Sequence, residues 1–410
     1  MLKERDISIL RELALQYAEA ASLPVHAEKR RLWNDNNECR PARPMVLIDQ
    51  ICWQEINTDG ALTGQAEDGY WRGVEEELRK KLYCWRHMPV DMVLTPYIQL
   101  PMPVHDSGWG LRVKEDVIEP EKNATACSHR MYDVLDSEEA LAQIQMPEFT
   151  LDTEALKRIR EEADVIFDGI IPYRMRGVSL HLGIWDKISF WRGVESCYID
   201  LLDRPEFMHA IMEKLTRGLL HQIDSANRQG IYDVSGTLIH CSHNFLDDLP
   251  AGDPEYGTTG QGWAFGLAQL FSSVSPEITR EFEVEYMKRV FPHFGAIYYG
   301  CCERLDDRLD VLEALPKVRK ISCSPWSDRE HFAEALPVGR VMSAKPNPAF
   351  LATDSFDEDA VRRDLRATIE AARRHNRSLE MILKDISTIR HDPARLWRWA
   401  EIAMEEAENE

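Results

Sequence analysis

The sequence predicts an α/β fold, a TIM (β/α)8 barrel with an N-terminal helical extension, and two observations carry that prediction. Short apolar runs alternate with helical patterns from about residue 150 onwards, as in parallel βαβ units. Several of these runs end in polar or reactive side chains, which is where such barrels place their chemistry. An open doubly wound sheet is the alternative, but the chain lacks the Gly-rich first turn of dinucleotide folds.

Composition excludes several classes of partner. The chain has 410 residues, 44% of them hydrophobic, and a formal net charge of −21. An acidic protein repels nucleic acid and anionic lipid, and no apolar run is long enough to span a bilayer. The first residues form a charged amphipathic pattern unlike a signal peptide, so the nine cysteines are expected to be reduced thiols in the cytoplasm.

The first 150 residues are predicted to wrap the barrel and to supply its first strands. Apolar stripes favour helix over residues 1–37 and 71–87, and apolar runs favour strands over 45–51 and 90–100. The charged stretch over 101–150 is predicted to be a β-ribbon or an irregular insertion. With the rest of the chain, this segment forms one predicted barrel domain over 1–410.

Residues 151–410 are predicted to be the regular β/α part. The clearest helix covers 205–229, because apolar residues recur there at spacings of three and four and Gly230 follows. Pro276 and Glu277 mark a helix start after Ser275. The other predicted helices are 152–163, 190–202, 276–290, 357–375 and 393–405; the strands are 169–182, 232–239, 296–299, 318–321, 341–344 and 379–383.

Reactive side chains follow two of these strands in the stretch 296–328. Cys301, Cys302 and Glu303 come after the first strand, and Cys323 and Trp326 after the second. Thiolates are strong ligands for zinc, so one prediction is that Cys301 or Cys302, with Cys323 or a nearby Glu or His, lines the barrel mouth and binds zinc. Adjacent cysteines do not readily share one tetrahedral ion, and two buried small apolar residues are an equally weighted interpretation.

Three more strand ends carry candidate site residues. His240, Cys241 and His243 follow residues 232–239, Lys345 and Asn347 follow 341–344, and Lys384 and Asp385 follow 379–383. A histidine there suits an acid, a base or a metal ligand, whereas histidines bonded near a loop are the structural alternative. The Lys384–Asp385 pair serves either a substrate or a structural ion pair at the barrel top.

The early strand is followed by Asp49, Trp53 and Glu55. A carboxylate beside an indole ring suits a cationic or methylated substrate, and helix capping or packing is an equal alternative. The candidate catalytic residues are therefore Glu303, His240, Lys384 and Asp385, and the candidate substrate-binding residues are Asp49, Trp53, Glu55, Trp326, Lys345 and Asn347.

At these residues the chain resembles the uroporphyrinogen decarboxylase superfamily, and more closely its decarboxylase-like branch of corrinoid-dependent methyltransferases. The matching segments include RPMVLIDQICWQEI, YYGCCERLDD, VRKISCSPWSD, SAKPNPAFLA and MILKDISTIRHDPARLWRW. The resemblance implies a single TIM barrel and favours a homodimer. Zinc enzymes of this branch carry a His-x-Cys motif at a strand end; here Tyr299 stands in place of the histidine, so Glu283, Glu303, His240 or Cys323 would have to complete the ligand set.

The resemblance implies a methyltransferase that moves a methyl group from a small methylated substrate, a methoxylated aromatic or a methylated amine, to the cobalt of a corrinoid protein. Such demethylation in one-carbon metabolism needs a Lewis acid or a positioned proton donor, because the leaving group is basic. One alternative is decarboxylation of a tetrapyrrole or related polyacid, for which Arg43, Arg174 and Arg176 are the candidate basic residues. The other is a non-catalytic binding barrel, in which Glu303 and Lys384 would be surface residues.

Overall fold

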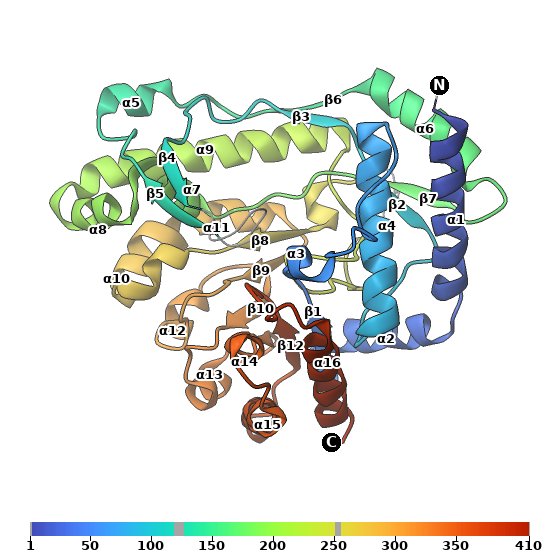
Figure 1. Ribbon diagram of the computed structural model, residues 1–410. Coiled ribbons are helices and arrows are strands. Elements are labelled where there is room, and N and C mark those ends of the chain that lie inside the picture. Colours follow the sequence, from blue (N-terminus) through green and yellow to red (C-terminus); the bar gives the residue numbers. More distant parts are fainter. Residues whose placement is uncertain (1, 119–126, 251–255, 410) are drawn as a thin grey trace.

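The computed structural model describes residues 2–118, 127–250 and 256–409, and a six-stranded sheet lies at its centre (Figure 1). All neighbouring strands of this sheet are parallel, and helices cover its outer side. The α/β class is therefore confirmed. In spatial order the strands are β1 (Met45–Ile48), β12 (Leu379–Leu383), β11 (Val341–Ala344), β10 (Val318–Cys323), β9 (Ala296–Tyr299) and β8 (Trp263–Gly266).

Further backbone pairing extends this sheet at its β8 edge. β2 (Ile98–Pro101) and β7 (Tyr173–Arg176) form a separate parallel pair. Isolated parallel bridges join Val178 to Tyr232 and His181 to Phe265, which lies in β8. Among the described residues the named strands do not form one closed ring, so the eight-stranded barrel stays a prediction.

Several predicted elements are present with the predicted bounds or within a few residues of them. α9 (Pro205–Gln229) ends at Gly230, whose φ of 63° is the left-handed conformation that glycine adopts most easily. Strands β9, β11 and β12 match the predicted ranges. The helices α6 (Thr153–Phe167), α15 (Glu358–Arg374) and α16 (Pro393–Glu408) shift by a few residues at their ends, where capping rather than periodicity sets the boundary.

Other predicted elements are corrected by the structure. The strands predicted over 45–51, 90–100 and 169–182 shrink to β1, β2 and β7, and residues 232–239 contribute only bridges. The helix predicted over 190–202 is two helices, α7 (Ile184–Arg192) and α8 (Val194–Asp203), because Gly193 adopts a φ of 74° between them. β8 was not predicted, since WAFG is short and ends in glycine. The stretch 247–262 is rich in Asp, Gly and Pro, which predicts a loop, and part of it lies outside the described residues.

The N-terminal part packs as a layer of helices beside the sheet. Residues of α1, α4 and α6 share a second apolar core with β2 and β7. The ribbon predicted within 101–150 is confirmed for the described residues, where β3 pairs with β6 and β4 with β5, both antiparallel. The bounds are α1 (Glu4–Ala21), α2 (Val25–Asn37), α3 (Trp53–Ile56), α4 (Gly69–His87), α5 (Glu138–Gln143), β3 (Val104–Asp106), β4 (Glu115–Ile118), β5 (Ser128–Met131) and β6 (Phe149–Leu151).

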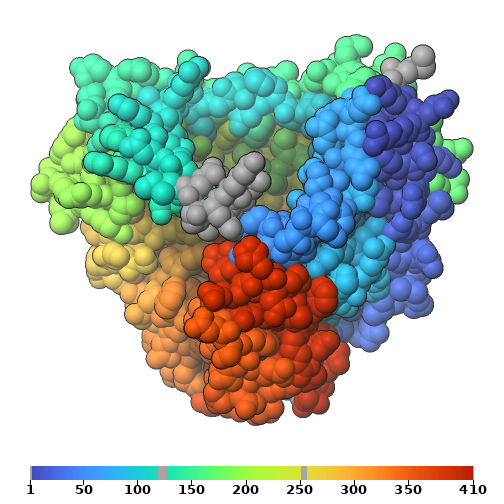
Figure 2. Space-filling model, in the orientation of Figure 1, coloured from blue at the N-terminus to red at the C-terminus, as the bar shows by residue number. Residues whose placement is uncertain are grey.

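The C-terminal part supplies short helices and turns between the sheet strands. In Figure 2 the orange and red C-terminal segments, the blue N-terminal segment and the cyan and green segments above them surround a recessed centre. No described helix is both long and apolar enough to cross a membrane. The remaining bounds are α10 (Pro276–Thr279), a π-helical turn (Arg280–Val284), α11 (Glu285–Val290), α12 (Leu309–Leu312), α13 (Arg329–Ala335), α14 (Ala349–Ala352) and the 3-10 turns Thr259–Gln261, Gln269–Ser273 and Phe291–His293.

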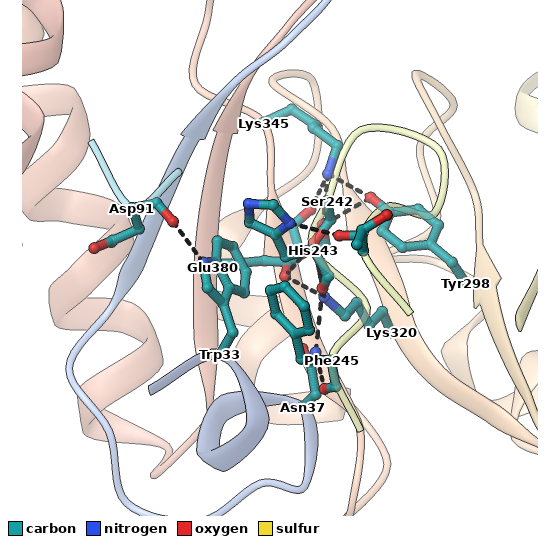
Figure 3. Close-up of polar contacts among 12 residues, drawn as sticks. Trp33, Asn37, Asp91, Ser242, His243, Phe245, Tyr298, Lys320, Lys345 and Glu380 are labelled. Atoms are coloured by element: carbon teal, nitrogen blue, oxygen red, sulfur yellow. Dashed lines mark hydrogen bonds and ion pairs between the residues drawn. The ribbon is translucent and has the colours of Figure 1, made fainter. Parts of the chain in front are cut away.

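The inner side of the sheet carries a buried polar layer, seen in part in Figure 3. Lys320 of β10 donates to Glu380 of β12 at 2.6 Å, and both side chains are fully buried. Lys345, just after β11, donates to Tyr298 of β9 and to the hydroxyl of Ser343, each at 2.6 Å. Because these residues come from adjacent strands in register, the inward side chains form one connected hydrogen-bonded network, in which Glu380 pairs with Lys320 and neutral oxygens accept from Lys345.

Candidate active site

Charged and sulfur-bearing side chains meet above this polar layer, beyond the carboxyl ends of three chain segments. They are His240, the Cys301–Cys302 pair after β9, and the Lys384–Asp385 pair after β12. His240 and Asp385 have φ values of 54° and 56°. Left-handed backbone is uncommon for residues other than glycine, and it concentrates at functional sites. The sequence prediction that these strand ends converge is supported by their contacts.

The Cys301 sulfur lies between two basic side chains. Lys384 Nζ is 2.9 Å away and His240 Nε2 is 3.6 Å away. The Cys302 sulfur lies 3.4 Å from the Cys301 sulfur. It also donates a hydrogen bond to Asp385 Oδ2 at 2.9 Å. A hydrogen bond from Cys302 holds the pKa of Cys301 well below its ordinary value, despite burial, and His240 and Lys384 act in the same direction. Cys301 is therefore a thiolate at neutral pH.

The two cations beside this thiolate keep their protons. Burial alone would lower the pKa of His240, but the nearby sulfurs of Cys241 and Cys301 raise it to about 9. Its ring stacks on Phe265 with centroids 3.9 Å apart, which fixes its orientation. Burial also lowers the pKa of Lys384, and the Cys301 thiolate more than offsets that effect, so the pKa of Lys384 is raised. The site therefore stores two protons next to one sulfur anion.

Glu303, predicted to be catalytic, supports the cysteine loop from below. Its Oε2 atom accepts the backbone N–H of Cys301 at 2.8 Å, and the side chain is buried. Burial raises the pKa of Glu303, and the Cys301 thiolate adds to that shift. The sequence did not single out Asp186, whose pKa is raised to about 7 by burial and by Glu303, because this residue lies in the first turn of α7 and not directly at a strand end.

The residues predicted to bind substrate lie in different places. Asp49 and Trp53 line a cavity of about 380 Å³ between β1 and α4. Lys345 belongs to the polar layer below, Asn347 accepts the N–H of Ala349 at the start of α14, and Trp326 is 69% exposed. Of the six predicted substrate-binding residues, only Asp49 and Trp53 line this cavity. The sequence pattern alone could not distinguish these two from the other four.

A second cavity of about 500 Å³ reaches His240 and His181. Both cavities share the wall residues Glu77 and Lys81 of α4, Gln99 of β2, and Thr237 and Leu238 of the loop before His240. Asp49 is half-buried at the edge of the first cavity, and burial raises its pKa. Two adjoining spaces of this size suit a small substrate whose reacting end meets His240.

Glu55 has a structural position. Its Oε2 atom accepts the backbone N–H groups of Ile389 and His391, at 2.8 and 2.9 Å, and so holds the turn that follows Lys384 and Asp385. Burial raises the pKa of Glu55, but hydrogen bonds from Thr388 and these N–H groups outweigh it and the net pKa is lowered. The stabilisation is therefore complete above an ordinary glutamate pKa of about 4.3 and is lost as pH falls below it.

We expect Glu55→Ala to lower the free energy of unfolding by about 2–3 kcal/mol, because two N–H groups lose their acceptor. Glu55→Gln keeps one acceptor oxygen and should lose clearly less. Urea denaturation of the three proteins at neutral pH measures this difference. Unchanged stability of Glu55→Ala together with lost ligand binding would instead support the predicted substrate-binding role.

Cys323, predicted as a possible zinc ligand, does not join Cys301 and Cys302. Along β10, Lys320 points inward and Ser322 donates its hydroxyl to the Cys301 carbonyl, so Cys323 faces the opposite, helix-covered side. There it lies in the apolar core, and burial raises its pKa to about 12. Within the described parts of the chain no group of three or more His, Cys, Asp and Glu side chains is arranged to hold a metal ion. The side chains that surround Cys301 therefore do not fit a zinc ion as they stand.

Comparisons with known proteins leave the chemistry to be argued from this geometry. No family model matches the chain, and no curated protein matches it. Among solved structures, a methyltransferase from Methanosarcina mazei matches with 9% sequence identity and a TM-score of 0.49, over 92% of this chain and 98% of that one. A likeness at this level carries no argument about reaction or substrate.

Proposed function

We propose that this protein is a methyltransferase that moves a methyl group from a small methylated substrate to the cobalt of a corrinoid carried by a partner protein. One observation carries the proposal: two protonated bases, His240 and Lys384, flank the Cys301 sulfur where a cavity reaches the strand ends. A methyl ether or methylated amine reacts slowly because its leaving group is basic. A proton donor fixed beside that group lowers the barrier.

His240 is the proposed proton donor because it is both protonated and in the cavity wall. With a pKa of about 9 it carries its proton at neutral pH, yet remains acidic enough to release it. As the carbon–oxygen or carbon–nitrogen bond breaks, the electron pair stays on the leaving atom and the His240 proton moves to it. Lys384 then returns a proton toward His240 across the 3.3 Å between Nζ and Nε2.

The Cys301 thiolate has an electrostatic part in this scheme. It keeps both neighbouring bases protonated, and it stabilises the imidazolium of His240 until the leaving group takes the proton. The reduced corrinoid supplies the nucleophile when the partner is bound. The two cavities, of about 380 and 500 Å³, suit a small methyl donor and are too small to enclose a corrin ring, so the partner would approach over the recessed face.

Among the two substrate classes the geometry favours methoxylated aromatics. An ether oxygen or a neutral amine must gain a proton when it leaves, whereas a quaternary ammonium group leaves as a neutral amine without one. A site that holds two protons beside the cavity suits a leaving group that must gain a proton, such as an ether oxygen. The apolar wall that Met88, Val90 and Leu94 add to the first cavity suits an aromatic ring.

Decarboxylation of a polyacid is the second candidate and has weaker support. Of its three basic candidates, Arg176 lines the second cavity, while Arg43 forms an ion pair with buried Asp91 and Arg174 packs over the ring of Tyr97. One arginine beside an acidic Glu77 at 3.7 Å is a poor match for several substrate carboxylates.

The test is methyl transfer to free reduced cobalamin from a panel of methoxylated aromatics and methylated amines. We expect the absorbance of the reduced corrinoid to give way to that of methylcobalamin with at least one methoxylated aromatic and not with a quaternary ammonium compound. No transfer from any donor, together with carbon dioxide release from a tetrapyrrole acid, would favour the decarboxylase instead.

A further inference from the structure

Cys301 and Cys302 are neighbours in the chain, and their sulfur atoms also lie side by side. The two Sγ atoms are 3.4 Å apart. Lys384 Nζ lies 2.9 Å from the Cys301 sulfur, and the Cys302 thiol donates to Asp385 Oδ2 at 2.9 Å. One sulfur is therefore an anion held beside a cation, and the other is a thiol that a small rotation brings against it.

Cys301 differs in reactivity from several other cysteines of the chain. Burial raises the pKa of Cys84, Cys197 and Cys323 to about 12, so these thiols stay protonated and react slowly. The cavity of about 500 Å³ reaches His240, whose Nε2 atom is 3.6 Å from the Cys301 sulfur, and so gives small molecules a path toward this thiolate. Because thiolates and not thiols react with peroxides, oxidation should select Cys301.

We propose that Cys301 and Cys302 form a reversible redox site, in which a hydroperoxide converts the two adjacent thiols to a disulfide. The Cys301 sulfur attacks the peroxide, the oxygen–oxygen bond breaks, and Cys301 becomes a sulfenic acid. The oxygen anion that leaves takes a proton from His240, beside the Cys301 sulfur. The inference concerns sulfur chemistry alone, so it stands or falls separately from the proposed methyl transfer.

The second step joins the two sulfurs. The Cys302 sulfur attacks the sulfenic sulfur, and the thiol proton passes to Asp385, which already accepts its hydrogen bond. The proton then leaves with the hydroxyl group of the sulfenic acid as water. In the whole reaction the sulfur pair loses two electrons and the peroxide gains them, so the only co-reactant is the hydroperoxide.

The spacing of the two residues makes the oxidised form easy to reverse. Adjacent Cα atoms are about 3.8 Å apart across a trans peptide bond, whereas disulfides usually join Cα atoms roughly 4.4–6.8 Å apart. A disulfide between neighbours is therefore strained, and strain makes the bond easier to reduce. We expect a small dithiol to restore both thiols.

Oxidation should also change the charge state of the site. Burial lowers the pKa of His240, and the sulfurs of Cys241 and Cys301 raise it to about 9. A disulfide removes the Cys301 anion but leaves the Lys384 cation, so the pKa of His240 should fall, which proton NMR of the ring measures. Loss of methyl transfer on oxidation is a further expectation that rests on the proposed function.

The test is to treat the reduced protein with hydrogen peroxide, count the remaining thiols and locate the oxidised sulfurs by mass spectrometry. Wild-type protein should lose both thiols of the pair, and dithiothreitol should restore them. The rate should change little between about pH 6 and about pH 8, whereas the thiolate fraction of an ordinary cysteine rises roughly 75-fold over that range.

Three variants separate the steps. Cys302→Ser should stop at the sulfenic acid of Cys301, which dimedone captures. Cys301→Ser should keep its Cys302 thiol under the same treatment, because the activated sulfur is gone. The matched control is Cys39→Ser, since Cys39 is half-buried outside the site and burial raises its pKa; it should lose the same two thiols as the wild type.

Two results on the wild-type protein would overturn the inference, and neither depends on whether a variant folds. The first is a protein that keeps both thiols of the pair at peroxide concentrations that oxidise a free thiol. The second is a protein in which Cys301 is oxidised to a sulfenic or sulfinic acid without forming the bond to Cys302. A Cys301→Ser protein oxidised at Cys302 as fast as the wild type would also contradict the assigned order of steps.

Discussion

Glu380→Gln is expected to lower the free energy of unfolding by at least about 3–5 kcal/mol, the cost of breaking a buried ion pair from one side. Glu380 is the carboxylate in the inner polar layer that binds Lys320 directly, and Ser343 donates to its other oxygen at 2.5 Å. Without it, Lys320 and Lys345 are left as two buried ammonium groups facing each other across the layer. Urea denaturation measures the loss.

Two comparison variants make this prediction specific. Glu285→Gln breaks an exposed pair with Lys288 and should cost less than about 1 kcal/mol. Replacing both partners, Lys320→Met with Glu380→Leu, removes the unpaired charge and should recover part of the loss. Burial raises the pKa of Glu380, but Lys320 and Lys345 outweigh it and lower the pKa. The stabilisation should therefore hold above about pH 4.3 and fall as pH drops. A Glu380→Gln protein as stable as the wild type would contradict this account of the layer.

His240→Gln is expected to reduce the rate of methyl transfer by about 10²–10⁴-fold, the range for losing a positioned proton donor. Glutamine keeps much of the shape but cannot release a proton, so kcat should fall while KM changes little. The matched control is His331→Gln, on the exposed face of α13. A methyl donor whose leaving group is weakly basic needs no proton, so His240→Gln should transfer its methyl group at close to the wild-type rate. An equal loss of rate with every methyl donor would exclude the proton-donor role of His240.

The convergence of Cys301, His240, Lys384 and Asp385 was predictable from the sequence, because each follows an apolar run and parallel strands end at one edge. The roles within the group were not. Whether Cys302 or Cys323 joins Cys301 depends on which side of β10 faces inward, and a short apolar run does not reveal that. From the sequence, a role for Lys384 in substrate binding and a role in a structural ion pair were equally plausible.

The inner polar layer was missed for a related reason. Lys320 and Glu380 lie inside short strands whose other residues are mostly apolar, and charged residues in such runs normally indicate exposed positions. Lys320 and Glu380 are 60 positions apart in the chain, so only the order of the strands in the sheet brings them together. Asp186 was missed for the same reason: its pKa is raised by burial and by Glu303, and both depend on the fold rather than on the sequence pattern.

The most direct test of the account is the titration of Cys301. The ultraviolet absorbance of the thiolate, measured as the difference between wild type and Cys301→Ser across pH, reports its ionisation. We expect the thiolate to persist well below the ordinary cysteine pKa of about 8.5, and to require higher pH in His240→Gln and in Lys384→Met. A thiolate that appears only near the ordinary pKa, and does so equally in all three proteins, would contradict the claim that His240 and Lys384, together with the Cys302 hydrogen bond, hold Cys301 as an anion.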